Sequence, residues 1–541
     1  MRIAIFVVIF TVLFGTLTSS AFSSYDTYTY SIDGDPMKSP AAYSASQLID
    51  SPAMGLLSAD GLKKADVRYN SGKPYLLKDP NGEDTPENRE YLDPADVRTD
   101  KDGNRYIKES CNLLGASDIV TDEEGSVYIA DTGGTKGSYT YAGRIVVLNK
   151  YYQVKKVLTD YVDENGVAQV FNEPAGVYVT DPTITADGES YIYVCDTKNS
   201  RIVVFDRDYN YVRTLGTPST ALLSDSTFQP SAVAVDKYGR IFVLSKNCEE
   251  GVIVLSSEGD FTGFIGAQKV VYSVLQIIWR HFQTKEQLAQ QALTLPAVYN
   301  NLTVDDDGFV YVTNNKIDAS KQIAAIKSKN ADYSPVKKLN SAGDEIMKRN
   351  GFFDPGGEVA ISTVKGTPSS IIDVAIGPEG SWSLLEESKA TTLKKRSRIF
   401  TYDQNGNLLF AFGDKGDQLG NGENYIGVTY QEVDGVTYLL LLDKSAEDDY
   451  KITVFTPTDY CDTIMKALRN QNEHNYSASI SYWEDVLKRN NNFDLAYIGI
   501  GKALFNQGKY EEAQEMLANA YETTYYSRAF SEVRKEIVGR W

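Results

Sequence analysis

The sequence contains very little histidine and cysteine. Its 541 residues include two histidines, His281 and His474, which leave almost nothing from which to build a Ser-His-Asp hydrolase site or a multi-histidine zinc site. The four cysteines are far apart and form no C-x-x-C pair, which argues against a disulfide scaffold or a zinc knuckle. They are Cys111, Cys195, Cys248 and Cys461. From these shortages we expect no catalytic constellation and no resident metal or other cofactor.

Basic residues are outnumbered by acidic ones. Lys and Arg total 54 against 73 Asp and Glu, which gives a formal net charge of −19. Such a surface repels nucleic-acid phosphates and anionic lipid headgroups, so neither is an expected partner. Hydrophobic residues make up 42% and aromatic residues 11% of the chain, a composition typical of globular proteins rather than disordered ones.

Long hydrophobic runs are absent after the first residues. Arg2, the apolar stretch 3–17 and the small residues at 19–23 follow the order of a secretory signal peptide, which we assign to residues 1–24. The apolar stretch is short for a membrane span of about 20 residues, so membrane association is expected only if the signal stays uncleaved. We therefore expect a secreted or extracytoplasmic protein, and the low cysteine content favours a bacterial cell envelope.

The clearest pattern in the chain is a repeat whose best copy spans Pro174 to Asp206. It predicts strands at 176–179, 191–194 and 201–205, with a tight Asp187-Gly188 turn between the first two. Asp-Gly between β-rich runs indicates a hairpin, because glycine tolerates the positive φ of such turns. The strands are apolar at successive positions, which indicates burial on both faces, as in stacked sheets.

This pattern recurs, with drift, about six times between Ala116 and Pro457. Each copy has a turn glycine, and successive turn glycines are 51 to 72 residues apart. The turn glycines are Gly125, Gly188, Gly239, Gly308, Gly380 and Gly435. Propeller blades repeat at roughly 40–50 residues, so these copies carry insertions. A single copy cannot bury its own faces, and closing the copies into a ring leaves only short protected edges.

The copies resemble the NHL-repeat β-propeller family. The second copy follows the family's core pattern most closely, in Tyr191-Ile-Tyr-Val-Cys-Asp-Thr-Lys-Asn-Ser-Arg-Ile-Val-Val-Phe205. The first and third copies match well, and the last three match less. The resemblance implies a six-bladed NHL-type β-propeller over residues 116–457. The expected fold class is therefore mainly β, followed by an α-helical C-terminal domain.

Residues 25–115 form an N-terminal segment that precedes the first copy. The sixth copy runs from its third strand, Lys451 to Phe455, directly into Pro457 and lacks a fourth strand. We expect the segment near Ala42–Ile49 to supply that strand and close the ring, which would cover two edges that otherwise invite aggregation. Residues 69–94, rich in Asn, Pro, Gly and Glu, predict a long exposed loop, and Asp96 to Ile107 resembles a blade hairpin.

Two connections within the repeat region are elaborated. Residues 267–295 are expected to contain a helical insertion, because apolar residues between Val270 and Ala292 fall at helical spacings. Trp279 and Phe282 in this insertion are candidate anchors for a docking partner. The alternative is that the insertion packs its apolar face on the blade below it. Residues 321–366 form a second connection with the composition of a loop.

From Thr458 onward the apolar period changes from strand to helix. Three pairs of residues, Tyr476 and Tyr510, Ser479 and Ala513, and Trp483 and Leu517, are each 34 residues apart. Residues 458–541 resemble tetratricopeptide repeats, whose period is 34. About two repeats are present, fewer than the roughly three that a free-standing array needs, so we expect these helices to pack on the propeller or on a partner. Tyr497 and Leu504 are candidate binding residues on this segment.

Three aspartates at the ends of predicted blade strands allow two interpretations. Asp131, Asp196 and Asp443 could lie near a channel mouth, where converging oxygens hold calcium, as in the propeller lactonases. The NHL resemblance implies instead that such aspartates are structural and pair with an arginine of their own blade, as Asp131 would with Arg144 and Asp196 with Arg201.

We therefore expect an exported, non-enzymatic binding scaffold. The expected partner is another envelope or secreted protein, or a glycan, bound through the propeller and the helices. The alternative is a calcium-dependent lactonase or hydrolase with its site in the propeller channel.

Overall fold

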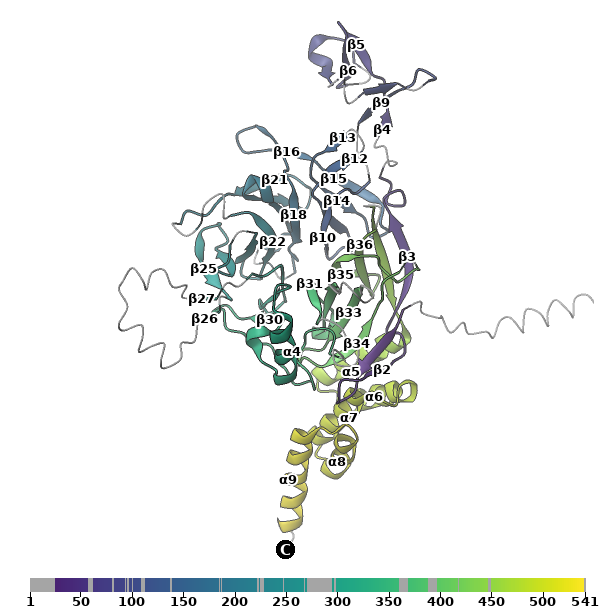
Figure 1. Ribbon diagram of the computed structural model, residues 1–541, viewed down its shortest axis with the longest axis vertical. Coiled ribbons are helices and arrows are strands. Elements are labelled where there is room, and N and C mark those ends of the chain that lie inside the picture. Colours follow the sequence, from purple (N-terminus) through teal and green to yellow (C-terminus); the bar gives the residue numbers. More distant parts are fainter. Residues whose placement is uncertain are drawn as a thin grey trace, which may run out of the picture.

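The chain forms a body of antiparallel sheets followed by a C-terminal group of helices (Figure 1). The structure is a computed structural model. It describes residues 25–539 except for 57–61, 80–81, 93, 95–96, 100, 109–111, 137–138, 184, 186, 221–222, 224–227, 247, 267, 270–293, 296–297, 360–367, 388–396, 417 and 446–448. Across these described ranges, no helix combines the length and the apolar character needed to cross a membrane.

Six antiparallel sheets make up the body, here numbered in chain order. Sheet 1 contains β10 (Ala116–Thr121), β11 (Val127–Asp131), β14 (Arg144–Leu148) and β15 (Val154–Leu158). Sheet 2 contains β18 (Pro174–Val179), β19 (Tyr191–Asp196), β20 (Arg201–Asp206) and β21 (Tyr211–Leu215). Sheet 3 contains β22 (Pro230–Val235), β23 (Ile241–Ser245), β24 (Val252–Leu255) and β25 (Phe261–Ile265).

The remaining three sheets depart from this regular form. Sheet 4 contains β28 (Asn301–Val304), β29 (Val310–Thr313) and β30 (Val336–Leu339). Sheet 5 contains β31 (Ser370–Ile376), β32 (Trp382–Glu387), β33 (Ser397–Tyr402) and β34 (Leu408–Phe412), extended by β1 (Thr27–Tyr30) and β2 (Pro36–Lys38). Sheet 6 contains β35 (Tyr425–Val433), β36 (Val436–Lys444), β37 (Tyr450–Pro457) and β3 (Tyr43–Asp50).

The first strands of these sheets follow one another in a cycle. β10 contacts β18, and the contacts continue through β22, β28, β31 and β35 back to β10. Between neighbouring sheets the apolar side chains form separate cores; Ile129 and Val146 of sheet 1, for example, pack with Leu440 and Leu442 of sheet 6. Burial on both faces is the reason these strands are apolar at successive positions. The arrangement is that of a β-propeller-like fold.

The hairpin turns use glycine where the backbone requires it. All six turn glycines identified in the sequence have positive φ, between 73° and 85°. Side chains with a Cβ rarely adopt this conformation, which explains why the glycine is the most regular feature of the repeat.

The N-terminal segment closes the sheet cycle. β3 pairs antiparallel with β37, from Tyr43 opposite Pro457 to Asp50 opposite Lys451, which is the pairing expected from the sequence. The Tyr43 ring stacks on Phe412 of sheet 5, with 5.7 Å between ring centroids. β1 adds to the outer edge of β34 in sheet 5, so the segment joins two neighbouring sheets.

The prediction of a long exposed loop over residues 69–94 is wrong. This region lies mostly in a sheet of β5 (Arg68–Asn70), β6 (Lys73–Leu77) and β7 (Arg89–Tyr91), with the short helix η1 (Pro86–Asn88). Gly72, with φ of 82°, forms the first turn, and Tyr75 and Tyr91 pack across the strands. Composition missed these strands because the residues that hold them together, aromatic rings and Asp84, are few and widely spaced.

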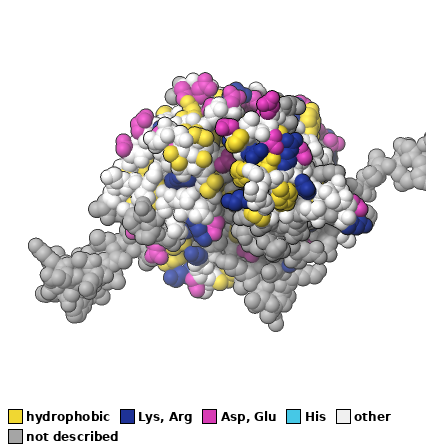
Figure 2. All heavy atoms as spheres, turned by 90° about the horizontal axis from the view of Figure 1, so that it is seen from above, with side chains coloured by type: hydrophobic (Ala, Val, Ile, Leu, Met, Phe, Trp, Pro, Cys, Tyr) yellow, Lys and Arg dark blue, Asp and Glu magenta, His cyan; other side chains and the backbone are white. Residues whose placement is uncertain are grey.

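A second small sheet lies beside the first, and both project from the body at the top of Figure 1. It contains β4 (Leu62–Lys64), β8 (Val97–Thr99) and β9 (Arg105–Lys108). The hairpin expected over Asp96–Ile107 is therefore present, but outside the six sheets. In Figure 2, which looks down on this end, Lys and Arg side chains are mixed with hydrophobic ones, and Asp and Glu side chains lie along the upper rim.

The structure describes only the ends of the first elaborated connection, residues 267–295, and much of the second, residues 321–366. In the first, β26 (Gln268–Lys269) pairs with β27 (Thr294–Leu295), and the residues between them, with Trp279 and Phe282, lie outside the described residues. In the second, expected as a loop, residues 319–328 form helix α4 (Ala319–Ser328), followed by η4 (Ala331–Tyr333). Asp318 caps α4 by accepting hydrogen bonds from the backbone N–H groups of Ser320 and Lys321.

Five helices complete the chain. They are α5 (Asp459–Asn472), α6 (Tyr476–Arg489), α7 (Asp494–Asn506), α8 (Tyr510–Asn519) and α9 (Thr523–Gly539). Successive helices pack against each other. Trp483 in α6 and Leu517 in α8, 34 residues apart, are both buried at equivalent positions. Gly501 permits the close approach of α7 and α8, because a Cβ there would lie 2.5 Å from the Leu517 Cγ atom.

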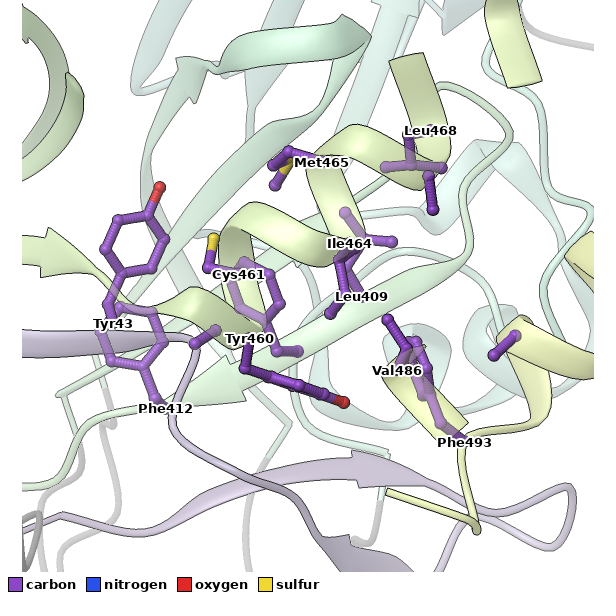
Figure 3. Close-up of a cluster of buried hydrophobic side chains, with 14 of the residues drawn as sticks. Tyr43, Leu409, Phe412, Tyr460, Cys461, Ile464, Met465, Leu468, Val486 and Phe493 are labelled. Atoms are coloured by element: carbon purple, nitrogen blue, oxygen red, sulfur yellow. The ribbon is translucent and has the colours of Figure 1, made fainter. Parts of the chain in front are cut away.

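The helices share a hydrophobic core with the sheets (Figure 3). Tyr460, Cys461 and Ile464 of α5 pack with Leu409 and Phe412 of β34 in one continuous cluster. The same cluster extends through α6 and α7 to α8. Of the two expectations for the helical segment, packing on the propeller or on a partner, the structure shows packing on the body of sheets.

Candidate binding cleft

The three aspartates singled out in the sequence lie at the ends of second strands, not of the innermost strands. Asp131 ends β11 and its carboxylate is 2.9 Å from the Arg144 guanidinium; Asp196 ends β19 and is 2.7 Å from Arg201. Both ion pairs are the ones implied by the NHL resemblance. Asp443 occupies the corresponding place in β36, with the Lys451 ammonium at 3.7 Å.

Each of these carboxylates also holds the backbone that leads into the first strand of its sheet. The Oδ1 atoms of Asp131 and Asp196 accept hydrogen bonds from Gly115 N and Asn172 N, both at 2.7 Å. Asp443 accepts one from Asn424 N at 2.8 Å. The three side chains are fully buried, and each belongs to a different sheet. Their geometry is that of structural supports.

A different pair of carboxylates faces the channel between the first strands. A cavity of about 200 Å³ lies there, lined by residues from β10, β18, β22, β28, β31 and β35. Asp118 of sheet 1 and Asp373 of sheet 5 line this cavity, and so does Asn301 of sheet 4. The Asn301 amide donates a hydrogen bond to Asp373 Oδ1 at 2.5 Å.

Backbone amides satisfy both carboxylates. Asp118 accepts hydrogen bonds from its neighbour Ile119 N and from Val177 N of sheet 2, both at 2.9 Å. Asp373 accepts hydrogen bonds from Val374 N and Val428 N, both at 2.7 Å. Burial raises the pKa of Asp118 to about 6 against the effect of these donors, and burial followed by the charge of Asp118 raises the pKa of Asp373 well above its usual range.

Sequence reasoning missed this pair, although a signal was present. In sheets 1 and 5 the pairing of the first and second strands shifts register once, and Asp118 and Asp373 are the residues directly after that shift. Gly176 and Gly427 occupy the same position in sheets 2 and 6. Aligning the copies on this shift would have placed two acids on the channel. In the described part of the chain no group of three or more His, Cys, Asp or Glu side chains is arranged to hold a metal ion.

A recess with both apolar and polar walls lies between sheet 5 and the helices. This recess, here called the junction cleft, has a volume of about 440 Å³. Its walls are the end of β1, the loop 350–359, the β33–β34 turn, the start of α7 and the α8–α9 turn. Clefts at the boundary between two structural units are common ligand sites, so this is the candidate functional site.

The junction cleft combines aromatic rings with carboxylates. Phe352 and Phe353 line it from the loop, and Tyr521 lines it from the α8–α9 turn with 70% of its surface exposed. Asp494 in the first turn of α7 and Glu522 stand on the helical wall. Burial raises the pKa of Asp494. The combination suits a ligand with both an apolar and a cationic part.

Two shallower recesses adjoin the junction cleft. One, of about 510 Å³, shares Asn350 with it and is lined by amide side chains together with Glu379, Lys502 and aromatic rings. The amide side chains are those of Gln404, Asn405, Gln471, Asn472 and Asn506. The other, of about 420 Å³, shares Asp494 and includes Tyr497. The three recesses therefore follow the boundary between the sheets and the helices.

The two candidate binding residues of the helical segment, Tyr497 and Leu504, lie in different surroundings. Tyr497 is half-buried beside the recess that shares Asp494, and its hydroxyl donates to the Asn491 carbonyl at 3.2 Å. Leu504 is wrong as a docking residue, because it is buried in the core that joins the helices to the sheets. Trp279 and Phe282 lie outside the described residues and are not placed.

Comparison with known proteins gives distant similarities. No protein-family model and no curated protein matches the chain. The major allergen Mala s 1 of Malassezia sympodialis is 13% identical over 64% of this chain and 93% of that chain, with a TM-score of 0.38. The extracellular domain of a putative hybrid two-component system from B. thetaiotaomicron is 14% identical over 76% of this chain and 43% of that chain, with a TM-score of 0.33.

A glucose dehydrogenase is also similar, 11% identical over 64% of this chain and 98% of that chain, with a TM-score of 0.34. At these identities and TM-scores the similarities carry no argument about activity, ligand or partner.

Proposed function

We propose that the body is an NHL-type β-propeller of six blades and that the helices form tetratricopeptide-like hairpins. The cyclic order of the first strands and the positive φ of the six turn glycines support the propeller. The buried pair Trp483 and Leu517, at the same place in α6 and α8, supports the helical repeat.

We infer that the protein is an exported, non-enzymatic scaffold that binds another envelope or secreted protein. The observation that carries this proposal is the junction cleft: two modules fused by one core leave an aromatic and amide-lined recess along their boundary. Such a recess offers shape and hydrogen-bonding groups for recognition. The partner is therefore expected at this boundary and not on the outer sheet edges.

Site-specific crosslinking on intact cells tests this proposal. A photo-crosslinking residue replaces Tyr521 in the full chain, and a matched variant carries it at Tyr238, which is 67% exposed on sheet 3. A protein captured from Tyr521 and not from Tyr238 supports the scaffold. Equal capture from both positions, or none from Tyr521, contradicts it. The helices are not tested alone, because their core includes residues of the sheets.

A second candidate function, a calcium-dependent lactonase or hydrolase, has one observation in its favour. Asp118 and Asp373 both line the channel cavity with Asn301 nearby, and oxygen ligands of this kind suit calcium. Calcium should then raise the melting temperature by several degrees, and the rise should vanish in Asp118→Asn and Asp373→Asn. An unchanged melting temperature in calcium argues against this function.

A further inference from the structure

The basic groups near the junction cleft are engaged by the protein itself. The Lys329 ammonium donates hydrogen bonds to the backbone carbonyls of Arg349 and Gly351. The Arg349 guanidinium lies 2.7 Å from Glu345 and also pairs with Asp354. The positive charges at this end of the cleft are thus matched by carbonyl oxygens and carboxylates.

The helical wall carries the opposite charge. Asp494 is half-buried, and among the residues that the structure describes no basic side chain forms an ion pair with it. Burial alone raises its pKa, with no compensating donor. Glu522 stands nearby, with its Oε1 atom accepting a hydrogen bond from Tyr525 N at 3.2 Å. A partly desolvated carboxylate in this setting is stabilised by an incoming cation.

The opposite wall suits the alkyl stem of such a cation. Phe352 and Phe353 on the loop form this aromatic wall and are half-buried. The largely exposed Tyr521 ring adds a further aromatic face from the helical side, beside Glu522. Aromatic faces attract an ammonium or guanidinium group and also cover its methylene chain. A lysine or arginine side chain satisfies both walls at once, whereas a neutral sugar satisfies only the aromatic one.

The adjoining recess adds amide groups that can bind a peptide main chain, which a simple amine ligand lacks. Asn350 lines both recesses, and Gln404, Asn405, Asn472 and Asn506 continue the amide surface beyond it. Gln404 Nε2 donates a hydrogen bond to Asn472 Oδ1 at 2.7 Å, and Asn472 Nδ2 donates one to the Glu379 carbonyl at 3.4 Å. Each side-chain amide has two N–H donors and two acceptor lone pairs, so it keeps the further hydrogen-bonding capacity that an extended peptide backbone requires. The two recesses together therefore fit a main chain with one basic side chain.

We propose that the junction cleft binds an extended peptide segment of the partner, with one Lys or Arg side chain seated between Asp494 and the aromatic wall. This proposal rests on the scaffold function and specifies the chemistry of its partner. The ligand class is thus a basic peptide, presented by a protein in an extracytoplasmic compartment.

Binding of peptide pools to the full chain tests the proposal. The pools are pentapeptides of random sequence with a fixed central Lys, acetyl-Lys or Glu, and butylammonium chloride and a neutral oligosaccharide are separate probes. We expect the Lys pool to bind at least tenfold more tightly than the acetyl-Lys pool. Asp494→Asn should lower Lys-pool binding to the acetyl-Lys level, since the substitution removes only the charge.

Glu511→Gln is the matched control, because Glu511 also lies in the first turn of a helix, α8, but outside the cleft. It should bind the Lys pool as the unchanged protein does. Phe352→Leu provides a second cleft variant that keeps the charge; it should weaken binding severalfold. Melting temperatures of all three variants show whether each is folded.

Three results overturn the proposal. They are equal binding of the Lys and acetyl-Lys pools, unchanged binding in folded Asp494→Asn, and binding of butylammonium or the oligosaccharide in preference to every peptide pool. The crosslinking result is independent of these outcomes. If a partner is captured but the protein shows no preference for the Lys pool, the scaffold function is retained and the basic peptide is rejected as its ligand.

Discussion

Asp118 lies in sheet 1 and Val177 in sheet 2, and the Asp118 Oδ2 atom accepts a hydrogen bond from the Val177 backbone N–H at 2.9 Å. Asp373 repeats this bond from sheet 5 to Val428 of sheet 6, at 2.7 Å. The acceptor side chain thus belongs to one sheet and the donor to the next. Each carboxylate links two neighbouring first strands across the wall of the channel.

Because burial raises the pKa of Asp118 on folding, against the effect of the Val177 hydrogen bond, the stability of the protein should depend on pH. The carboxyl group titrates near 3.9 in an unfolded chain and at about 6 when folded. The folded state holds the proton more tightly, so the associated stability is fully present below the unfolded pKa and is lost as pH rises through about 6. Between pH 4 and pH 7 the free energy of unfolding should fall by on the order of 1 kcal/mol relative to Asp118→Asn.

Urea unfolding of both proteins at the two pH values measures this difference. Asp208→Asn, at an exposed turn, controls for the change in net charge. Parallel pH dependences in the unchanged protein and Asp118→Asn would refute the assignment of the effect to Asp118.

The closing strand should contribute strongly to stability through one side chain. Tyr43 is 1% exposed and packs on Phe410 and Phe412, whereas Leu48 on the same strand is 47% exposed. Tyr43→Ala should lower the free energy of unfolding by about 3 kcal/mol, in the range seen when large buried rings are removed. Leu48→Ala should cost less than about 1 kcal/mol. Similar losses in chemical denaturation of the two variants would contradict the packing described.

Deletion of residues 25–50 should have a larger effect than either substitution. It removes β1 from sheet 5 and β3 from sheet 6, and so exposes the backbone hydrogen-bonding edges of β34 and β37. Calorimetry of the truncated protein should show loss of the single cooperative transition of the sheet cycle. A sharp transition at the original temperature would show that the cycle does not need this segment.

The α7–α8 contact should not tolerate a side chain at Gly501. A Cβ there would lie 2.5 Å from the Leu517 Cγ atom, so Gly501→Val should force the helices apart and cost about 1–3 kcal/mol. Glu515→Ala on the exposed face of α8 is the control and should have little effect. Limited proteolysis of the full chain checks this, since loosened helices are cut faster. Equal cleavage rates would argue against close packing here.

The described cysteines should be inert in the native protein. Cys195, Cys248 and Cys461 are buried and not disulfide-bonded. Burial raises the pKa of the Cys248 and Cys461 thiols to about 12 and raises that of Cys195 well above its usual range, which suppresses the reactive thiolate. In a Cys111→Ser protein at pH 8, a thiol reagent should label these residues only after denaturation. Rapid labelling of the native protein would contradict their burial.

The sequence predicted those features that repeat or that follow from short-range backbone constraints. The turn glycines were recognisable because positive φ selects glycine, and the blade strands because burial on both faces selects continuous apolar runs. The need for β3 followed from a missing fourth strand after Phe455. The small sheet of β5, β6 and β7 was missed because its pattern occurs once and its strands are very short.

The candidate site was less accessible to sequence reasoning. Leu504 looked like a binding residue of a helical repeat, yet it is buried where α7 packs with its neighbouring helices, and sequence spacing within one helix does not show what packs on that helix. Asp494 and Phe352 meet at the junction cleft from positions 142 residues apart, and neither belongs to a motif.

The amino-acid sequence by itself determined the hairpin turns, the buried strands and the helical period, because each depends on residues close together in the chain. Only the tertiary structure decided which acids face the channel, which helix face is covered and where the junction cleft lies. Those features depend on contacts between distant segments, and the local pattern of polar and apolar residues does not encode such contacts.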